Sequence, residues 1–99
     1  MPAYMVGSFT VTNPEGFAPY GEPAIARVIA NGGEPLVIDT ASEAIEGEPR
    51  QVTIVLRFPN KEAAHAWYND PEYQKVIHLR HENAEGTMVF VDGVPHGDA

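Results

Sequence analysis

The sequence predicts a single α+β domain with the element order β-α-β-β-α-β. Three observations carry this prediction: a length of 99 residues, apolar runs typical of strands, and helix-start signals after the first and third runs. Hydrophobic residues make up 43% of the chain, which is ordinary for a globular protein. We assign the domain to residues 1–93 and expect residues 94–99 to form a loose C-terminal tail.

The first strand and helix are predicted from composition and capping residues. Residues 4–12 are rich in β-branched and aromatic side chains, which favours a strand. Asn13 then suits a helix N-cap, and Pro14 suits the first helical position. The helix should end at Gly32-Gly33, which permits a left-handed cap. Two prolines beyond the first turn predict an irregular first half and a regular stretch from about Pro23.

Two strands and their connection come next. The short apolar run within residues 35–40 predicts the second strand, and residues 51–58 form the clearest strand pattern of the chain. The segment between them, residues 41–50, is acidic and carries Gly47 and Pro49. We therefore expect an exposed hairpin connection.

The last third of the chain predicts a broken helical segment and a final strand. Asp70-Pro71 repeats the helix-start signature, with Asp70 as N-cap and Pro71 at the first helical position. We therefore predict two helices, at about residues 61–69 and 71–84. Gly86 should end the second helix, and residues 87–92 should form the last strand.

This element order is that of the ferredoxin-like fold, with a four-stranded antiparallel sheet and both helical layers on one face. A sheet with one wet face alternates apolar and polar residues, but three of these strands do not. The runs Leu36-Val37-Ile38, Ile54-Val55-Leu56 and Met88–Val91 are apolar on both faces. The bare face favours a homodimer joined through the sheet faces. The alternative is a monomer with scattered exposed apolar residues.

Charge and composition make several function classes unfavourable. Six Lys and Arg stand against 14 Asp and Glu, so the net charge is −8. An acidic chain is a poor match for nucleic acid or for an anionic membrane surface. The absence of cysteine excludes thiol catalysis and Cys-ligated metal, and fits a reducing compartment. With no signal-peptide pattern and no membrane-spanning run, we expect a cytoplasmic protein.

An ordered set of short landmarks resembles a known family. The set extends over nearly the whole chain, up to about Gly93, and its landmarks are Val11-Thr12-Asn13-Pro14-Glu15-Gly16-Phe17, Gly32-Gly33, Glu46-Gly47, Phe58-Pro59, Ala63-Ala64, Trp67-Tyr68, Pro71-Glu72-Tyr73 and Arg80. It is similar to the domain-of-unknown-function family 1330. The resemblance implies a ferredoxin-like fold and a dimeric α+β barrel, a superfamily that also holds cofactor-free monooxygenases, muconolactone isomerases and haem enzymes. Because the family has no established general activity, the resemblance assigns none.

Arg80 is the leading candidate for binding a ligand. Tyr73, Ile77 and Arg80 fall on one helical stripe, so the arginine stem should point inward and its head should seek an acceptor. A carboxylate or enolate-like ligand in the helix–sheet cleft would satisfy it, with Tyr20 and Tyr73 as further ligand-binding groups. The alternative is a structural cation that pairs with Glu46 or interacts with the helix C-terminus.

Acid–base candidates are His65, Tyr68 and Glu46. His65 and Tyr68 lie one helical turn apart and share a face. His78 and His81 also lie one turn apart, but no third ligand stands at a convincing spacing, so we expect no metal site.

Two functions remain in competition. The first is a cofactor-independent enzyme that acts by proton transfer on a small oxygenated or carboxylated metabolite. The second is a non-catalytic dimer that binds or senses a small anionic molecule; a haem or metal protein ranks last. An enzyme needs an acid or base with a tuned pKa in a closed cleft, whereas a binding module needs only shape and Arg80.

Overall fold

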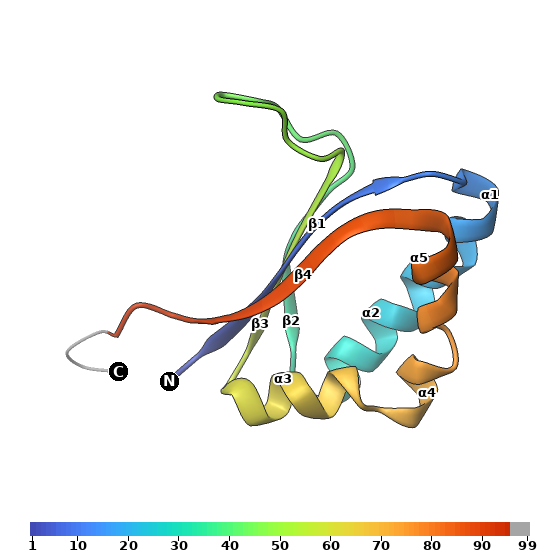
Figure 1. Ribbon diagram of the computed structural model, residues 1–99. Coiled ribbons are helices and arrows are strands. Elements are labelled where there is room, and N and C mark those ends of the chain that lie inside the picture. The colour runs from blue at the N-terminus through green and yellow to red at the C-terminus, as the bar shows by residue number, and fades with distance from the viewer. Residues whose placement is uncertain (96–99) are drawn as a thin grey trace.

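The computed structural model describes residues 1–95 and contains the predicted order of elements (Figure 1). The elements are β1 (Ala3–Val11), α1 (Pro14–Phe17), the 3₁₀ helix η1 (Ala18–Tyr20), α2 (Gly21–Ala30), β2 (Glu34–Asp39), β3 (Val52–Phe58), α3 (Lys61–Tyr68), α4 (Pro71–Gln74), α5 (Ile77–Asn83) and β4 (Ala84–Asp92). Residues 96–99 of the predicted tail lie outside the described residues.

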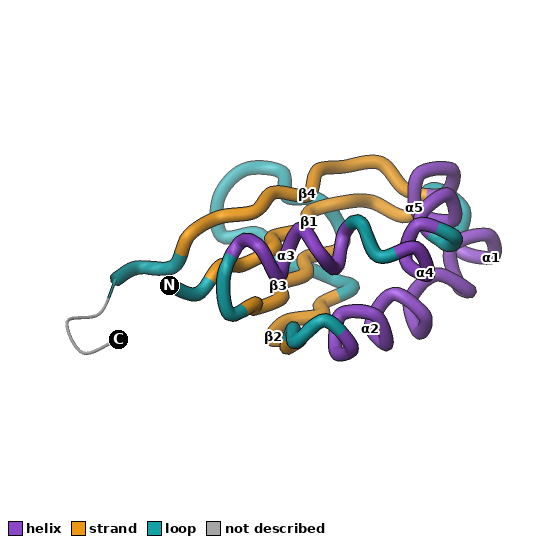
Figure 2. Tube along the Cα trace, turned by 90° about the horizontal axis from the view of Figure 1, so that it is seen from below, coloured by secondary structure: helices purple, strands orange, loops and turns teal. Residues whose placement is uncertain are grey.

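The strands form one antiparallel sheet in the order β2-β3-β1-β4. All helices lie on one side of this sheet (Figures 1 and 2), which confirms the ferredoxin-like α+β fold. The connection between β2 and β3 projects from one end of the sheet, on the side away from the helices. Nothing in the described chain covers the other sheet face.

The first helical segment follows its capping signals. The side chain of Asn13 accepts a hydrogen bond from the Gly16 amide, and Pro14 opens α1. Pro19 lies in the 3₁₀ turn η1, so the irregular first half is confirmed. The regular helix α2 begins slightly earlier than predicted, at Gly21. Gly32 has φ of 82° after the last turn, a left-handed conformation that suits glycine.

The second helical segment is broken twice, whereas the sequence predicted one break. The break at Asp70-Pro71 is confirmed, with the Asp70 side chain accepting from the Glu72 amide. A second break falls at Val76, which has φ of −111° and ψ of −7° and separates α4 from α5. Tight turns surround it, because the Val76 amide donates to the Tyr73 carbonyl and the Leu79 amide to the Val76 carbonyl. This kink accompanies the burial of both Tyr73 and Ile77.

The last strand begins at Ala84, three positions earlier than predicted, and Gly86 does not end a helix. Gly86 lies within β4 and pairs with Phe9. A Cβ at this position would collide with the Ser8 carbonyl oxygen, so the glycine marks a close approach between strands. The helix ends instead where the Asn83 carbonyl accepts from the amides of Thr12 and Asn13.

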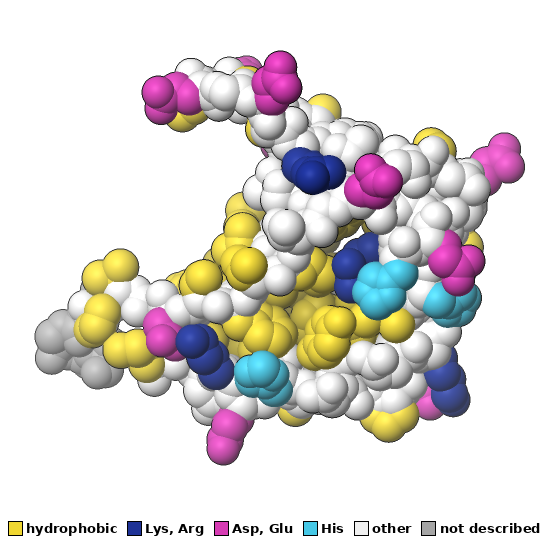
Figure 3. Space-filling model, viewed as in Figure 1, with side chains coloured by type: hydrophobic (Ala, Val, Ile, Leu, Met, Phe, Trp, Pro, Cys, Tyr) yellow, Lys and Arg dark blue, Asp and Glu magenta, His cyan; other side chains and the backbone are white. Residues whose placement is uncertain are grey.

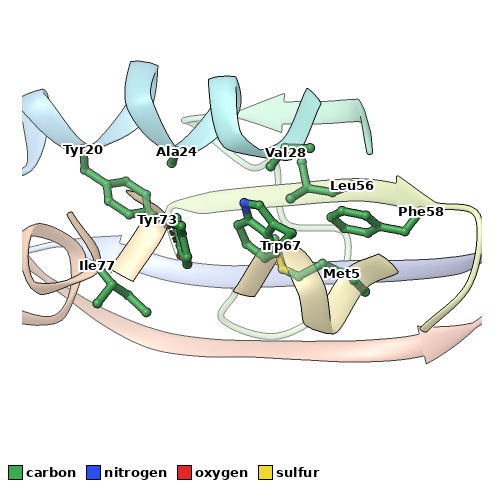
Figure 4. Packing of buried hydrophobic residues seen from close by; sticks show 10 residues of the cluster. Met5, Tyr20, Ala24, Val28, Leu56, Phe58, Trp67, Tyr73 and Ile77 are labelled. Atoms are coloured by element: carbon green, nitrogen blue, oxygen red, sulfur yellow. Dashed lines mark hydrogen bonds between the residues drawn. The ribbon is translucent and has the colours of Figure 1, made fainter. Parts of the chain in front are cut away.

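The core lies between the sheet and the helices and is rich in aromatic rings (Figure 4). Trp67 of α3 is its centre, with 1% of its surface exposed. Its ring centroid lies 4.5 Å from that of Tyr73 and 5.7 Å from that of Phe58. Met5 and Leu56 complete this part of the core from the sheet side.

A buried carboxylate ties α2 to the break between α3 and α4. The Oδ2 atom of Asp70 accepts from Arg27 Nε at 3.0 Å, Arg27 Nη2 at 2.8 Å and Asn31 Nδ2 at 2.8 Å. Oδ1 accepts from the Glu72 amide at 2.8 Å. The hydrogen bonds from Arg27, and after them those from Asn31 and Glu72, lower the pKa of Asp70 to about 2 against the raising effect of burial.

Asp70 predicts a loss of stability in acid. The pKa of its carboxyl is about 2 in the folded protein and about 3.9 in an unfolded chain, so the unfolded state takes up the proton first. The contribution of Asp70 is therefore complete above about pH 4 and declines as the pH falls toward 2. Asp70→Asn keeps a capping side chain but lacks the charge. We expect a lower urea midpoint at pH 7 and a weaker dependence of that midpoint on acid.

The matched control is Asp92→Asn, which removes an exposed carboxylate 3.4 Å from Lys61. Exposed pairs contribute little, so this variant should follow the wild type at every pH. Equal acid sensitivity in the wild type and Asp70→Asn would show that Asp70 does not supply this stability.

Candidate functional site

A polar pocket of about 430 Å³ opens beside the edge strand β4. Side chains of α3, α5 and β4 surround it, and its lining comprises Met5, His65, Trp67, Tyr68, Asn69, Arg80, His81, Met88, Val89 and Phe90. Figure 3 shows a hollow on this face with a hydrophobic floor and, at its wall, a cationic side chain beside a histidine. Three of the residues predicted as site residues, His65, Tyr68 and Arg80, therefore meet around one pocket.

Arg80 is half-buried and lacks a carboxylate partner within residues 1–95. Its Nε atom is buried without a hydrogen-bond partner there, and its Cζ atom lies 5.9 Å from the centroid of the Tyr20 ring. Burial disfavours the cation, but Tyr20 and Tyr73 outweigh that effect and raise the pKa of Arg80. Arg80 thus lines the pocket as a permanent cation that keeps one unused donor, its buried Nε.

His81 lies next to Arg80 at the rim of the pocket. Arg80 Nη2 donates to His81 Nε2 at 3.3 Å. Desolvation of the ring, and after it the Arg80 charge, lowers the pKa of His81, so the imidazole is neutral at pH 7. Because Nε2 faces a donor that is always protonated, the single ring proton lies on Nδ1.

Across the pocket, His65 packs on Phe90 with ring centroids 4.9 Å apart. Tyr68 contacts the same phenylalanine edge-on, at 6.5 Å. Both side chains come from α3, where the spacing of three residues places them on one face, as the sequence predicted.

Tyr20 of η1 and Tyr73 of α4 connect these two helical segments next to Arg80. Their hydroxyl oxygens lie 2.6 Å apart in a buried hydrogen bond (Figure 4). Tyr73 has 0% of its surface exposed. Burial, and after it the Tyr20 hydroxyl, raises the pKa of Tyr73 far above its ordinary value, although Arg80 acts in the opposite direction. Tyr73 is therefore a buried packing residue behind the pocket, and it does not line it.

A second, apolar cavity of about 590 Å³ lies between α2 and the sheet. Ala24, Ile25 and Val28 line it on the helix side, and Ile54 and Leu56 on the sheet side. Tyr20 also contributes to its wall, whereas Tyr73 lines neither cavity.

His81 and Trp67 are among the pocket residues that the sequence did not predict as site residues. His81 was considered only as a metal ligand with His78, and Trp67 was not considered as a site residue. His81 belongs to the pocket because of its contact with Arg80, and nothing in the local sequence indicates that contact. Glu46, by contrast, lies exposed in the β2–β3 connection and lines neither cavity of its own chain.

No group of three or more His, Asp or Glu side chains is arranged to hold a metal ion among residues 1–95. In the same described part of the chain, no helix has the length and apolar character to cross a membrane.

The chain matches one protein family over nearly its whole length. The model of the family described as domain of unknown function (DUF1330) matches residues 2–94. The chain belongs to this family. No curated protein matches the sequence.

Solved structures support the fold of this DUF1330 protein. A protein of unknown function from Rhodopseudomonas palustris aligns with a TM-score of 0.76 and 15% identity, covering 96% of this chain and 84% of that chain. SnoaB, a cofactor-independent oxygenase from Streptomyces nogalater, aligns with a TM-score of 0.66 and 12% identity, covering 99% and 98%. A de novo designed protein, Foldit4, aligns with a TM-score of 0.64 and 14% identity, covering 95% and 100%. These likenesses concern the fold alone.

The raised pKa of Tyr73 predicts its behaviour in alkali. Tyr73 should keep its proton in the folded protein while an unfolded chain loses it near pH 10, so stability falls as the pH rises through that range. The number of tyrosines that titrate near pH 10, followed by absorbance near 295 nm, should therefore be the same in folded wild type and folded Tyr73→Phe. In guanidinium the wild type should titrate four tyrosines and the variant one fewer.

The same variant leaves the Tyr20 hydroxyl without its partner. We expect Tyr73→Phe to lower the free energy of unfolding by about 1–3 kcal/mol. Loss of one tyrosine from the titration of the folded variant near pH 10 would contradict the assignment.

Proposed function

We propose that this protein is a cofactor-independent enzyme that moves a proton on a small oxygenated carboxylate bound in the polar pocket. The observation that carries the proposal is the pair formed by Arg80 and His81. Arg80 is a cation whose Nε has no partner, and its Nη2 atom lies 3.3 Å from Nε2 of a neutral imidazole. A cation beside a neutral base is what abstraction of a proton next to a carbonyl requires.

The proposed reaction divides the work between these two side chains. An oxygen of the substrate carboxylate or carbonyl accepts hydrogen bonds from the Arg80 guanidinium. Arg80 then no longer donates to His81 Nε2. Nε2 then accepts the proton from the substrate carbon, and the imidazole becomes a cation. The electron pair of the broken C–H bond moves onto the carbonyl oxygen, where Arg80 stabilises the enolate. In a substrate whose enolate is conjugated with a carbon–carbon double bond, return of the proton to the far carbon of that system gives an isomer and restores the neutral imidazole.

In this proposal, His65 and Tyr68 transfer a second proton on the other side of the pocket. Both lie on α3 and contact Phe90, whereas Arg80 and His81 lie on α5. A proton can thus leave one face of a bound substrate and be delivered to another position.

Proton exchange in heavy water tests the proposal. The wild type should accelerate exchange of the carbon-bound protons of 2-oxo and 3-oxo carboxylates, measured by proton NMR. His81→Gln should slow this exchange by about 10²–10⁴-fold, because it removes the base. Arg80→Lys should slow it by about 10²–10³-fold, because a lysine cannot reproduce the planar fork of donors.

The matched control is His78→Gln, an exposed histidine of the same helix that lines neither cavity. It should exchange protons at the wild-type rate. If His81→Gln also does so, His81 is not the base, and His65→Gln becomes the decisive variant. Carboxylate binding that depends on Arg80 but brings no exchange would favour the alternative function, a binding or sensing module.

We further propose that two copies of the chain pack through their uncovered sheet faces. One row of valines crosses all four strands on that face, since Val37 pairs with Val55, Val55 with Val6, and Val6 with Val89. Ile45 in the β2–β3 connection is 90% exposed. In Figure 1 this connection extends beyond the sheet on the same side, so a copy seated on the valine row would meet it.

Sedimentation tests this assembly. The wild type should sediment at twice the chain mass of 10.8 kDa. Val89→Glu should shift it toward the monomer, because Val89 is 48% exposed and the new charge would be buried between the sheets. Ile29→Glu is the control, since Ile29 is 61% exposed on α2 and the substitution should leave the dimer intact. A monomeric wild type, or a dimer that survives Val89→Glu, would contradict this mode of packing.

A further inference from the structure

The two cavities between the helices and the sheet share a wall. Met5, Trp67 and Met88 line both the polar pocket of about 430 Å³ and the apolar cavity of about 590 Å³. Close-packed interiors leave few voids larger than a water molecule, whereas pockets for organic ligands span about 300–1,000 Å³. The apolar cavity thus has the size and the lining of a ligand pocket.

One residue in the wall of the apolar cavity carries a buried donor without an acceptor. Trp67 is 1% exposed, and its Nε1 atom has no hydrogen-bond partner within residues 1–95. In Figure 4 the nitrogen edge of this ring faces α2, the helix from which Ala24 and Val28 line the cavity. A buried indole N–H ordinarily finds an acceptor, so an acceptor oxygen on a ligand would complete this wall.

The shared wall is adaptable. Two of its three residues are methionines, whose unbranched side chains change rotamer at low cost and adjust to irregular surfaces. A molecule that entered from the polar pocket could therefore pass between Met5 and Met88, along the edge of Trp67. Its charged end would stay at Arg80, while its apolar part would occupy the cavity beneath α2.

We propose that the two cavities are compartments of one site, and that its ligand is a bipartite carboxylate. The carboxylate binds Arg80, an oxygen further along accepts from Trp67 Nε1, and an extended aliphatic or aromatic body fills the apolar cavity. This inference rests on the proposed function in one respect, the binding of the anionic end by Arg80. It goes further by assigning the class of molecule: apolar oxo or hydroxy acids, and not the smallest metabolic acids.

Fluorescence gives a direct measurement, because Trp67 is the only tryptophan of the chain and borders both compartments. The probes are acetate, decanoate below its micelle concentration, 3-oxodecanoate and the neutral decanol. We expect decanoate to bind at least tenfold more tightly than acetate or decanol. The 3-oxo acid should bind more tightly than decanoate, because it adds an acceptor.

Two variants separate the compartments. Ile25→Phe should fill part of the apolar cavity and weaken decanoate binding at least tenfold while acetate binding stays unchanged. Arg80→Gln should weaken decanoate binding at least tenfold while decanol binding stays unchanged. Ile29→Phe is the matched control, since it adds the same ring to the same helix at an exposed position outside the cavity. Circular dichroism verifies folding, and Ala24→Leu replaces Ile25→Phe if that variant does not fold.

The inference is overturned if decanoate binds no more tightly than acetate, or if filling the apolar cavity leaves decanoate affinity unchanged. In either case, proton exchange on short oxo acids that still depends on Arg80 and His81 would leave the proposed function standing. Conversely, tight binding of decanoate that needs both compartments but brings no exchange on 3-oxodecanoate would support the bipartite site and contradict the enzyme.

Discussion

The position of the helices over the sheet depends on the hydrogen bonds to the Asp70 carboxylate. Arg27 donates to it from α2 and Asn31 from the C-cap of that helix, and the Glu72 amide donates to it from the start of α4. The helix α2 is thereby tied to another helical segment as well as resting on the strands, and the apolar cavity remains open beneath it. A carboxylate satisfied by four donors is held ionised, so this buried acid serves the architecture and has no capacity left for proton transfer.

The geometry of the polar pocket follows from the same helix break. Tyr73 comes three residues after Asp70, in the first turn of the helix that this carboxylate caps. Its hydroxyl is held by Tyr20, and its ring packs against Trp67. Arg80 then lies over the Tyr20 ring, with Tyr20 and Tyr73 as its neighbours. A structural arginine would have a carboxylate in this position. This environment keeps the cation in place without neutralising it, which leaves its charge available to a ligand.

The sequence predicted what local signals encode and missed what tertiary contacts decide. Strand composition, the caps at Asn13 and Asp70 and the glycines after α2 were enough for the fold and for one helix break. The kink at Val76 carries no local signal, because its benefit is the burial of residues on both sides of it. The helical stripe predicted an inward-pointing Arg80 stem, and in the structure Arg80 lines one pocket together with His65 and Tyr68. The partners of Asp70, 43 and 39 residues away, and the contact between Arg80 and His81 could be recognised only in the folded chain.

The fold leaves the chemistry open, because a natural oxygenase and a designed protein share it at 12% and 14% identity. The function must therefore be read from side chains and from charge. A net charge of −8 repels anions over the whole surface, so long-range attraction does not bring a carboxylate to this protein. Arg80 acts only at short range, inside a pocket whose partly desolvated walls strengthen each contact. Burial of apolar ligand surface is then the contribution best able to offset this electrostatic repulsion. The site therefore favours a carboxylate with a large apolar body over a small anion without one.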